Sequence, residues 1–355
     1  MKRSMYHVIG VMSGTSLDGV DLCYVTFTKN NRWKFDIHHS KTIPYSKEWQ
    51  QKLKQAISYE AKQLGQLDTD YTLFLARVIS GFIEDFKIKT IDAICSHGHT
   101  VFHQPEKGVT KQIGNLEHLA KVLQQQIVCD FRVQDVDFGG QGAPLVPIGD
   151  RLLFSEFDYC LNLGGFANIS FEREEERVAY DICPVNIVLN RYSERLGMSY
   201  DIGGNIARSG ALNLELLADL NRLKFYQQPP PKSLGLEWVE NSVIPLIDSY
   251  DMKTENILRT MVEHAALQIS NVIPMNSRVL FTGGGAYNTF LMACISGKKP
   301  LNMEIPDATI IEYKEAIIFG FLGVLKLRNE INCLRSVTGA FKDHSSGKIF
   351  RIKTS

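Results

Sequence analysis

Residues 7–27, H-V-I-G-V-M-S-G-T-S-L-D-G-V-D-L-C-Y-V-T-F, decide how the chain begins to fold. An apolar run gives way to the polar, glycine-bounded stretch 13–19 and then resumes, which is the pattern of two strands joined by a hairpin turn. Asn30 and Asn31 mark a second turn before the apolar stretch W-K-F-D-I at 33–37. We therefore expect an antiparallel meander of three strands.

Helical patterns and apolar strands alternate after this meander. Helices are expected over about 47–60, 70–86 and 114–125, and strands over I-D-A-I-C-S-H (91–97), ending at Gly98, and I-V-C-D-F (127–131). Alternation of this kind is typical of α/β domains.

The opening pattern then occurs a second time. C-L-N-L (160–163) leads into Gly164 and Gly165, continues as F-A-N-I-S-F (166–171), turns through the charged stretch 172–177 and returns as V-A-Y-D (178–181). One strand–turn–strand unit used twice predicts two related α/β domains and excludes a solenoid of fixed period. Further helices are expected near 185–196, 212–223 and 254–272, and the strand R-V-L-F-T (278–282) precedes three glycines, the last of which, Gly285, is expected to open a helix.

Composition narrows the class of protein. The 355 residues suffice for two domains with a core each. Lys plus Arg and Asp plus Glu both number 39, so the basic surface of a nucleic-acid-binding protein is not expected. The longest apolar run, 316–325, is shorter than the roughly 20 residues of a membrane helix, and the run 8–12 is shorter than a signal-peptide core. With an odd number of cysteines, 7, and no zinc- or thioredoxin-type pair, we expect a cytoplasmic protein without nucleic-acid or membrane partners.

Three glycine-rich turns, at 13–19, 164–165 and 283–285, each follow an apolar strand. Glycine lets a ligand approach the backbone closely, and consecutive N–H groups form a nest for phosphate oxygens. Each turn alone is also compatible with an ordinary tight loop. Three of them, two at the duplicated position, favour a nucleotide, although the Walker A, G-x-G-x-x-G and H-R-D motifs are absent from the sequence.

Acidic residues beside these turns are candidates for chemistry. Asp18 and Asp21 offer hard oxygen ligands for Mg²⁺, although Asp18 also suits a simple turn. Asp181 ends the return strand beside the second turn and is a candidate general base. A purely structural alternative makes Asp181 the N-cap of a helix that starts near Pro184.

The segment D-F-R-V-Q-D-V-D-F-G-G-Q-G-A-P-L-V-P, residues 130–147, is predicted to be loop-like and dense in hydrogen-bonding groups. It either holds a polyol or acid ligand or forms a solvated crossover between domains; the candidate ligand-binding side chains are Asp130, Arg132, Asp135 and Gln141. His97, His99 and His103 lack the spacing of a zinc site, because alternate strand residues point to opposite faces. His97 or His99 is expected to donate or accept hydrogen bonds in a cleft.

Long motifs in order along the chain resemble the anhydro-N-acetylmuramic acid kinase family. They are G-V-M-S-G-T-S-L-D-G-V-D (10–21), D-F-R-x-x-D with G-G-Q-G-A-P-L-V-P (130–147), N-L-G-G-F-A-N-I-S (162–170), P-P-K-S-x-G-x-E (230–237), T-G-G-G-A-Y-N (282–288) and V-T-G-A (337–340). The resemblance implies an α/β fold of two ribonuclease-H-like domains of the sugar kinase, heat-shock chaperone and actin superfamily, with an interdomain nucleotide cleft. The implied domains are 1–155, with the first phosphate hairpin, and 156–355, with the second hairpin and the adenosine loop and with its last part packing back on the first domain.

The resemblance also implies an activity, in which ATP and Mg²⁺ serve to phosphorylate 1,6-anhydro-N-acetylmuramic acid while water opens its internal ether. The product is N-acetylmuramic acid 6-phosphate, a step of peptidoglycan recycling, and the enzyme is expected to form a homodimer. Asp181 is the implied catalytic base. The implied nucleotide-binding residues are Gly14, Thr15, Ser16, Leu17, Asp18, Gly19, Val20, Asp21, Gly164, Gly165, Gly283, Gly284 and Gly285, with Asp18 and Asp21 at the metal; the implied sugar-binding residues are His97, Asp130, Arg132 and Glu315.

The chain departs from the family pattern at several of these motifs. Cys183 and Val185 stand where D-T-G-P-G-N has glycines, His99 replaces the glutamine of H-G-Q-T, and Leu234 and Leu236 replace a hydroxyl donor and an arginine. Two alternatives follow: a kinase for another 1,6-anhydro sugar that lacks the lactyl acid, or a catalytically inactive nucleotide- or sugar-binding regulator.

Overall fold

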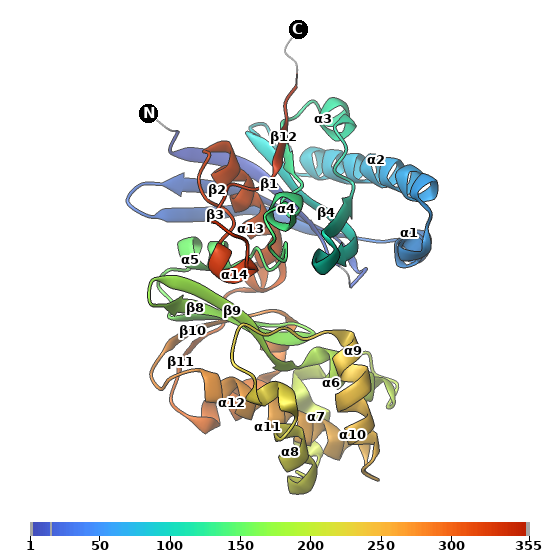
Figure 1. Ribbon diagram of the computed structural model, residues 1–355, viewed down its shortest axis with the longest axis vertical. Coiled ribbons are helices and arrows are strands. Elements are labelled where there is room, and N and C mark those ends of the chain that lie inside the picture. Colours follow the sequence, from blue (N-terminus) through green and yellow to red (C-terminus); the bar gives the residue numbers. More distant parts are fainter. Residues whose placement is uncertain (1–2, 15, 353–355) are drawn as a thin grey trace. The chain divides into compact units, whose positions relative to one another are not determined.

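A computed structural model describes residues 3–14 and 16–352 (Figure 1). The chain divides into two compact units, Met1–Leu153 with Tyr313–Ser355 and Phe154–Glu312. Each unit is built around one sheet, and the interdomain nucleotide cleft stays a prediction. In the described residues, every helix is too short or too polar to cross a membrane.

The first unit has a seven-stranded sheet in the order β12-β6-β4-β1-β2-β3, with β5 paired to β4. β1 pairs antiparallel with β2, as expected for the opening hairpin, and parallel with β4. The strands are β1 (Met5–Ser13), β2 (Gly19–Lys29), β3 (Trp33–Pro44), β4 (Ala93–Gln104), β5 (Val109–Ile113), β6 (Ile127–Cys129) and β12 (Lys348–Phe350).

Two long helices pack on opposite faces of this sheet: α2 (Ala61–Asp85) and the part of α13 (Ala308–Leu327) that belongs to this unit, from Tyr313 on. Ile9 and Val11 of β1 belong to the apolar cluster that includes Leu75 of α2. Gly10 points to the other face, where an added Cβ would lie 1.9 Å from the carbonyl oxygen of Ala316. Glycine at position 10 therefore allows α13 to approach the sheet backbone closely. The other helices of this unit are α1 (Lys47–Gln55), α3 (His118–Leu123), α4 (Val133–Asp137), α5 (Pro147–Leu153) and α14 (Arg335–Thr338).

The second unit has a five-stranded sheet in the order β11-β10-β7-β8-β9. Its strands are β7 (Tyr159–Leu163), β8 (Phe166–Arg173), β9 (Glu176–Pro184), β10 (Arg278–Thr282) and β11 (Asn302–Glu304). In both units an antiparallel meander is followed by two parallel strands that extend the sheet from its first strand. This shared order confirms the predicted duplication and the α/β, ribonuclease-H-like fold class.

Helix α11 (Thr254–Val272) is the centre of the second unit's core. Its buried residues, such as Leu258 and Met261, belong to one apolar cluster with residues of β7, β9 and β10. The remaining helices are α6 (Asn186–Glu194), α7 (Asn205–Ser209), α8 (Leu214–Asn221), α9 (Leu236–Trp238), α10 (Ile244–Asp248) and α12 (Thr289–Lys298), and Figure 1 shows them with α11 below the sheet strands β8 and β9.

Some element boundaries differ from those predicted. β4 does not end at Gly98 but continues to Gln104, because Gly98 has a φ of 75° that glycine tolerates inside a strand, and β5 then pairs with the extension. The segment 130–147 contains the short helix α4 instead of being entirely loop. Helical structure does begin at the third glycine turn, as the 3-10 helix Gly284–Tyr287, but α12 begins only at Thr289, where the Asn288 side chain accepts a hydrogen bond from the N–H of Leu291.

Candidate functional site

The first glycine turn joins β1 to β2. Thr15, a predicted phosphate-binding residue, lies outside the described residues. Ser16 and Asp18 are exposed, so their hydroxyl and carboxylate are accessible to a ligand. Leu17 has a φ of 61°, in the left-handed region, where a non-glycine residue stores about 1 kcal/mol or more of strain. The carbonyl of Leu17 accepts a hydrogen bond from Gln50 Nε2 at 3.1 Å, which helps to hold this conformation.

The glycines of this turn serve different purposes. A Cβ on Gly19 would lie 2.4 Å from the carbonyl oxygen of Ile43, so packing against β3 requires glycine there. A Cβ on Gly14 would meet nothing closer than Ser16 Oγ at 3.5 Å, an ordinary contact. The fold thus leaves room at Gly14 that a ligand can use. Val20 is fully buried, backbone included, so the structure leaves none of its surface accessible to a ligand.

Asp21 lies on β2, where Thr42 Oγ1 of β3 donates a hydrogen bond to its Oδ1 at 2.6 Å. Loss of solvation raises the pKa of Glu315 on α13, and the negative charge of Asp21 adds to that rise. In the described part of the chain, neither Asp18 nor Asp21 joins a group of three metal-ligating side chains. The exposed Asp18 carboxylate offers the hard oxygen ligands that Mg²⁺ prefers, and proteins usually hold Mg²⁺ by one or two carboxylates together with waters and phosphate oxygens.

Arg132 and His97 form the polar centre of the predicted sugar-binding group. Arg132 Nε donates to His97 Nε2 at 2.9 Å, and its Nη1 donates to the carbonyl of Gly142 at 2.7 Å. Nδ1 of His97 lies 2.9 Å from the carbonyl of Gly98 and therefore carries the proton, because a carbonyl can only accept. Loss of solvation, and then the charge of Arg132, hold the pKa of His97 well below its usual value, so the ring is neutral.

Glu315 couples electrostatically to this pair, whereas Asp130 lies in a different interaction. Loss of solvation lowers the pKa of Arg132 to about 10, and the charge of Glu315 opposes that change. The Glu315 side chain is accessible but crowded by protein, and the loss of solvation raises the pKa of its carboxyl while Arg132 lowers it. Asp130 Oδ2 is 2.5 Å from Lys348 Nζ of β12. The structure therefore joins His97 to Arg132 by a hydrogen bond, places Glu315 within electrostatic range of Arg132, and pairs Asp130 with a lysine.

Of the two further members of the 130–147 set, Asp135 does not fit the role considered for it, whereas the role of the Gln141 side chain stays a prediction. Asp135 is fully buried and accepts hydrogen bonds from Thr338 Oγ1 and the N–H of Gly142, both at 2.7 Å. Gln141 is exposed, and its backbone N–H donates to the carbonyl of Thr338 at 2.7 Å. A polyol cannot reach Asp135 in this arrangement.

The second glycine turn connects β7 to β8 and is fastened to the start of α6. The N–H of Val185 donates to the carbonyl of Gly165 at 2.8 Å, and the N–H of Asn186 donates to the carbonyl of Gly164 at 3.3 Å. A Cβ on Gly165 would meet only the Cβ of Ile187, at 3.7 Å. Gly165 is also exposed, so packing does not explain the glycine.

The glycines of the third turn also differ in whether the fold requires them. Gly283 has a φ of 79° and Gly285 would place a Cβ 2.7 Å from that of Leu163, so the fold requires both glycines. Gly284 is exposed, and a Cβ there would approach only Asn186 Nδ2, at 4.0 Å. Asn186, whose Nδ2 donates to the carbonyl of Leu163 at 3.2 Å, thus lies next to both turns of this unit. Sequence reasoning did not select Asn186, although it is the last residue of D-I-C-P-V-N.

Asp181 lies on β9, paired across the sheet with Asn168. Its Oδ2 accepts a hydrogen bond from the N–H of Leu234 at 2.8 Å, and its own N–H donates to the carbonyl of Lys232 at 3.0 Å. Loss of solvation raises the pKa of the Asp181 carboxyl, against the opposing effect of the Leu234 hydrogen bond. Because α6 begins at Asn186 with Val185 as its N-cap, the alternative role of Asp181 as a helix N-cap is wrong.

The residues that replace glycines near Asp181 are accommodated. Cys183 is fully buried in the core of the second unit, opposite Ala167 in the sheet. Val185 has a φ of −128°, outside the left-handed region that favours glycine.

A buried chain of hydroxyl groups lies beneath the first turn, and sequence reasoning missed it. Ser13 Oγ is 3.0 Å from His99 Nδ1 and 2.6 Å from Tyr45 OH, which is in turn 2.5 Å from Tyr71 OH. Loss of solvation lowers the pKa of His99 to about 4. A neutral His99 therefore anchors the residue that precedes the turn.

The chain is similar to known proteins over nearly its whole length. A family model described as anhydro-N-acetylmuramic acid kinase matches residues 6–352. Proteins named anhydro-N-acetylmuramic acid kinase from Mannheimia succiniciproducens and Sulfurovum sp. are 33% and 32% identical to it, covering 97% and 99% of this chain and 98% and 100% of their own. The one from Haemophilus influenzae is 32% identical, over 99% of this chain and 98% of its own. A solved structure, the activator of the 2-hydroxyisocaproyl-CoA dehydratase from Clostridium difficile with bound ADPNP, matches 91% of this chain and 96% of its own at 12% identity, with a TM-score of 0.47.

Proposed function

Since the chain belongs to the anhydro-N-acetylmuramic acid kinase family, we propose that it uses ATP to convert 1,6-anhydro-N-acetylmuramic acid and water into N-acetylmuramic acid 6-phosphate. In this reaction water adds to the anomeric carbon, the 1,6-ether bond breaks, and the freed 6-oxygen takes the γ-phosphoryl group. The proposal places the reaction in peptidoglycan recycling in the cytoplasm. The seven free cysteines agree with that compartment, because a reducing environment keeps thiols reduced. The protein is also proposed to form a homodimer, and its molar mass in solution, measured by light scattering, tests this.

The observation that carries the proposal is the environment of Asp181. The Leu234 N–H fixes Oδ2, and among the described residues no hydrogen bond engages Oδ1. Oδ1 is therefore the oxygen that can accept a proton from the attacking water. Because loss of solvation raises the pKa of this carboxyl, the ionised form is a stronger base than an exposed aspartate.

The nucleotide site is proposed from the glycines that the fold does not require. Gly14 in the first unit, and Gly165 and Gly284 in the second, leave room that packing does not use. Phosphate oxygens can approach the backbone N–H groups at such positions. The exposed Ser16 and Asp18, with Asp21, would lie along the same phosphate chain, where Mg²⁺ neutralises charge during phosphoryl transfer.

The sugar site is proposed around Arg132, His97 and Glu315. The guanidinium is positioned by two hydrogen bonds, from Nε and Nη1, and so presents its charge in a fixed direction. A fixed guanidinium suits the lactyl carboxylate of the muramic sugar. Glu315 can accept hydrogen bonds from sugar hydroxyl groups.

One observation favours a second candidate, a kinase for an anhydro sugar without the lactyl acid. Leu236 stands where the resembled family has arginine, and it is 52% exposed. Leucine cannot replace the charged fork of arginine in recognising an acid. This candidate keeps Asp181 as the base and changes only the substrate.

The test is ADP release by the purified protein with Mg²⁺ and ATP. Three sugars are supplied in parallel: 1,6-anhydro-N-acetylmuramic acid, 1,6-anhydro-N-acetylglucosamine and levoglucosan. Turnover of the muramic sugar, with a product whose mass shows the gain of one water and one phosphate group, supports the proposal. Turnover of another sugar alone supports the second candidate, and silence with all three contradicts both.

A further inference from the structure

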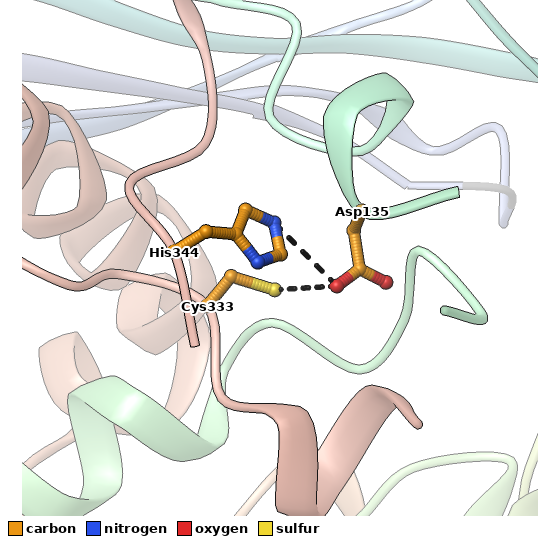
Figure 2. A group of neighbouring side chains, drawn as sticks. All are labelled: Asp135, Cys333 and His344. Atoms are coloured by element: carbon orange, nitrogen blue, oxygen red, sulfur yellow. Dashed lines mark hydrogen bonds and ion pairs between the residues drawn. The ribbon is translucent and has the colours of Figure 1, made fainter. Parts of the chain in front are cut away.

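Three metal-ligating side chains converge inside the first unit, outside the groups assigned above (Figure 2). Asp135 is on α4, Cys333 precedes α14 and His344 follows it. Cys333 and His344 face each other in an isolated antiparallel bridge. Their relative exposures are 0% for Asp135, 1% for Cys333 and 6% for His344, so all three are buried.

The imidazole of His344 presents a nitrogen without a hydrogen bond to this cluster. Its Nδ1 is 3.1 Å from the carbonyl of Lys342, and because a carbonyl only accepts, Nδ1 carries the proton. In the neutral ring, Nε2 then carries the lone pair. It lies 3.6 Å from Asp135 Oδ1, too far for a hydrogen bond, and finds no other partner in the described residues. A buried unpaired nitrogen that faces a carboxylate is unfavourable unless a positive charge lies between them.

Cys333 completes a donor set that suits a transition metal. Its Sγ lies 3.0 Å from the same oxygen, Oδ1 of Asp135. The ligand atoms of the three residues all lie within 4.8 Å of one another. Thiolate, imidazole and carboxylate are the ligands that Zn²⁺ takes in proteins, and three of them leave one position of a tetrahedron for water.

We propose that Asp135 Oδ1, Cys333 Sγ and His344 Nε2 bind one transition-metal ion of the zinc type. On binding, the thiol of Cys333 gives up its proton to solvent and ligates as the thiolate. The hydrogen bond that Cys333 donates to Asp135 is thereby exchanged for bonds from sulfur and oxygen to the metal.

The surroundings of the three side chains match those of metal ligands. Oδ2 of Asp135 accepts from the N–H of Gly142 at 2.7 Å, and Nδ1 of His344 donates to a backbone carbonyl. Such outer contacts fix the orientation and tautomer of metal-binding residues. The backbone of Gly140 also packs closely against the Asp135 carboxylate, since a Cβ on Gly140 would lie 2.3 Å from Asp135 Oδ2.

A metal here would fasten the 130–147 segment to the last part of the chain. Two backbone hydrogen bonds already join them. The N–H of Gln141 donates to the carbonyl of Thr338 at 2.7 Å, and the N–H of Phe341 donates to the carbonyl of Phe138 at 3.1 Å. The role is structural, and it holds whether or not the chain phosphorylates an anhydro sugar.

The test measures metal directly. The full-length protein, without a polyhistidine tag, is loaded with Zn²⁺, freed of excess metal, and assayed for zinc by mass spectrometry. A parallel sample is loaded with Co²⁺ and examined for the near-ultraviolet charge-transfer band that only a cobalt–thiolate bond gives. We expect about one ion per chain and a clear thiolate band.

Variants locate the ion. Cys333→Ala and His344→Gln should lose most of the bound metal, whereas Cys294→Ala, at a free cysteine of the second unit, and His103→Gln, at an exposed histidine, should keep it. A folded wild-type protein without bound zinc and without the cobalt–thiolate band would overturn the proposal, and the cluster would then hold only protons. Metal that is retained by both Cys333→Ala and His344→Gln would overturn it as well. The wild-type cobalt spectrum decides the question even where a variant fails to fold.

Discussion

The backbone N–H of Leu234 donates a hydrogen bond of 2.8 Å to Oδ2 of Asp181, although 53 positions separate the two residues. The donor is a main-chain group, so the leucine side chain at this position does not weaken the contact. The hydrogen bond stabilises the ionised carboxylate, while loss of solvation acts in the opposite direction and raises its pKa.

A first prediction concerns this hydrogen bond. Leu234→Pro removes the donor, so the pKa of Asp181 should rise further and the acidic limb of the kcat/KM profile should move to higher pH. Activity falls as pH drops through this pKa, because the base must be ionised. Leu234→Ala keeps the N–H and serves as the control. Equal acidic limbs in the two variants would show that the hydrogen bond does not tune the base.

A second prediction separates the glycines that the fold requires from those it does not. Gly165→Ala should raise the KM for ATP about tenfold or more, since the added methyl group fills space reserved for the ligand, with an unchanged or higher melting temperature. Gly283→Ala, at a φ of 79°, should instead lower stability by about 1–2 kcal/mol. Calorimetry and ATP kinetics on both variants check this. A Gly165→Ala enzyme with normal ATP kinetics would remove Gly165 from the nucleotide site.

A third prediction concerns Arg132. Arg132→Lys keeps the charge but cannot bond both His97 Nε2 and the Gly142 carbonyl, so kcat/KM for the sugar should fall at least about tenfold. Each buried group left unpaired should cost about 1–3 kcal/mol of stability. Arg222→Lys, at a surface ion pair with Asp219 on the other unit, is the matched control. Steady-state kinetics with sugar and with ATP varied separately would contradict this assignment if only the KM for ATP changed.

A fourth prediction concerns His99. With a pKa of about 4 it is neutral at physiological pH, and its role is to hydrogen-bond Ser13 at 3.0 Å. His99→Gln, which introduces the residue of the resembled family, should keep near-normal turnover. His99→Leu should lose much of it because Ser13 and the turn after it lose their anchor. If the leucine variant turned over as fast as the wild type, the buried hydroxyl chain would have no part in positioning the turn.

Sequence patterns could predict the duplicated hairpins and the fold class, because each glycine–polar turn between apolar strands is a local signal. They also placed Asp181 on the return strand of the second hairpin, where β9 carries it. The hydrogen bond from Leu234 left no such signal, since any residue except proline supplies an N–H. Pairing between distant residues is likewise invisible: Asp130 and Asp135 look alike in sequence, yet Lys348 pairs with the first while Cys333 and Thr338 bind the second. Gly98 misled in another way, because its positive φ occurs within a strand and not at its end.

The measurement that tests the central claim most directly compares wild-type protein with Asp181→Asn. Both are assayed for product from 1,6-anhydro-N-acetylmuramic acid and ATP, for ATP binding and for thermal unfolding. Folding raises the pKa of Asp181, so the ionised carboxylate destabilises the folded state at pH values above that pKa. The neutral amide of asparagine avoids this destabilisation and should not lower the melting temperature. The account predicts a loss of product formation of about 10³-fold, with ATP binding and folding retained. Near-normal turnover by Asp181→Asn would contradict it.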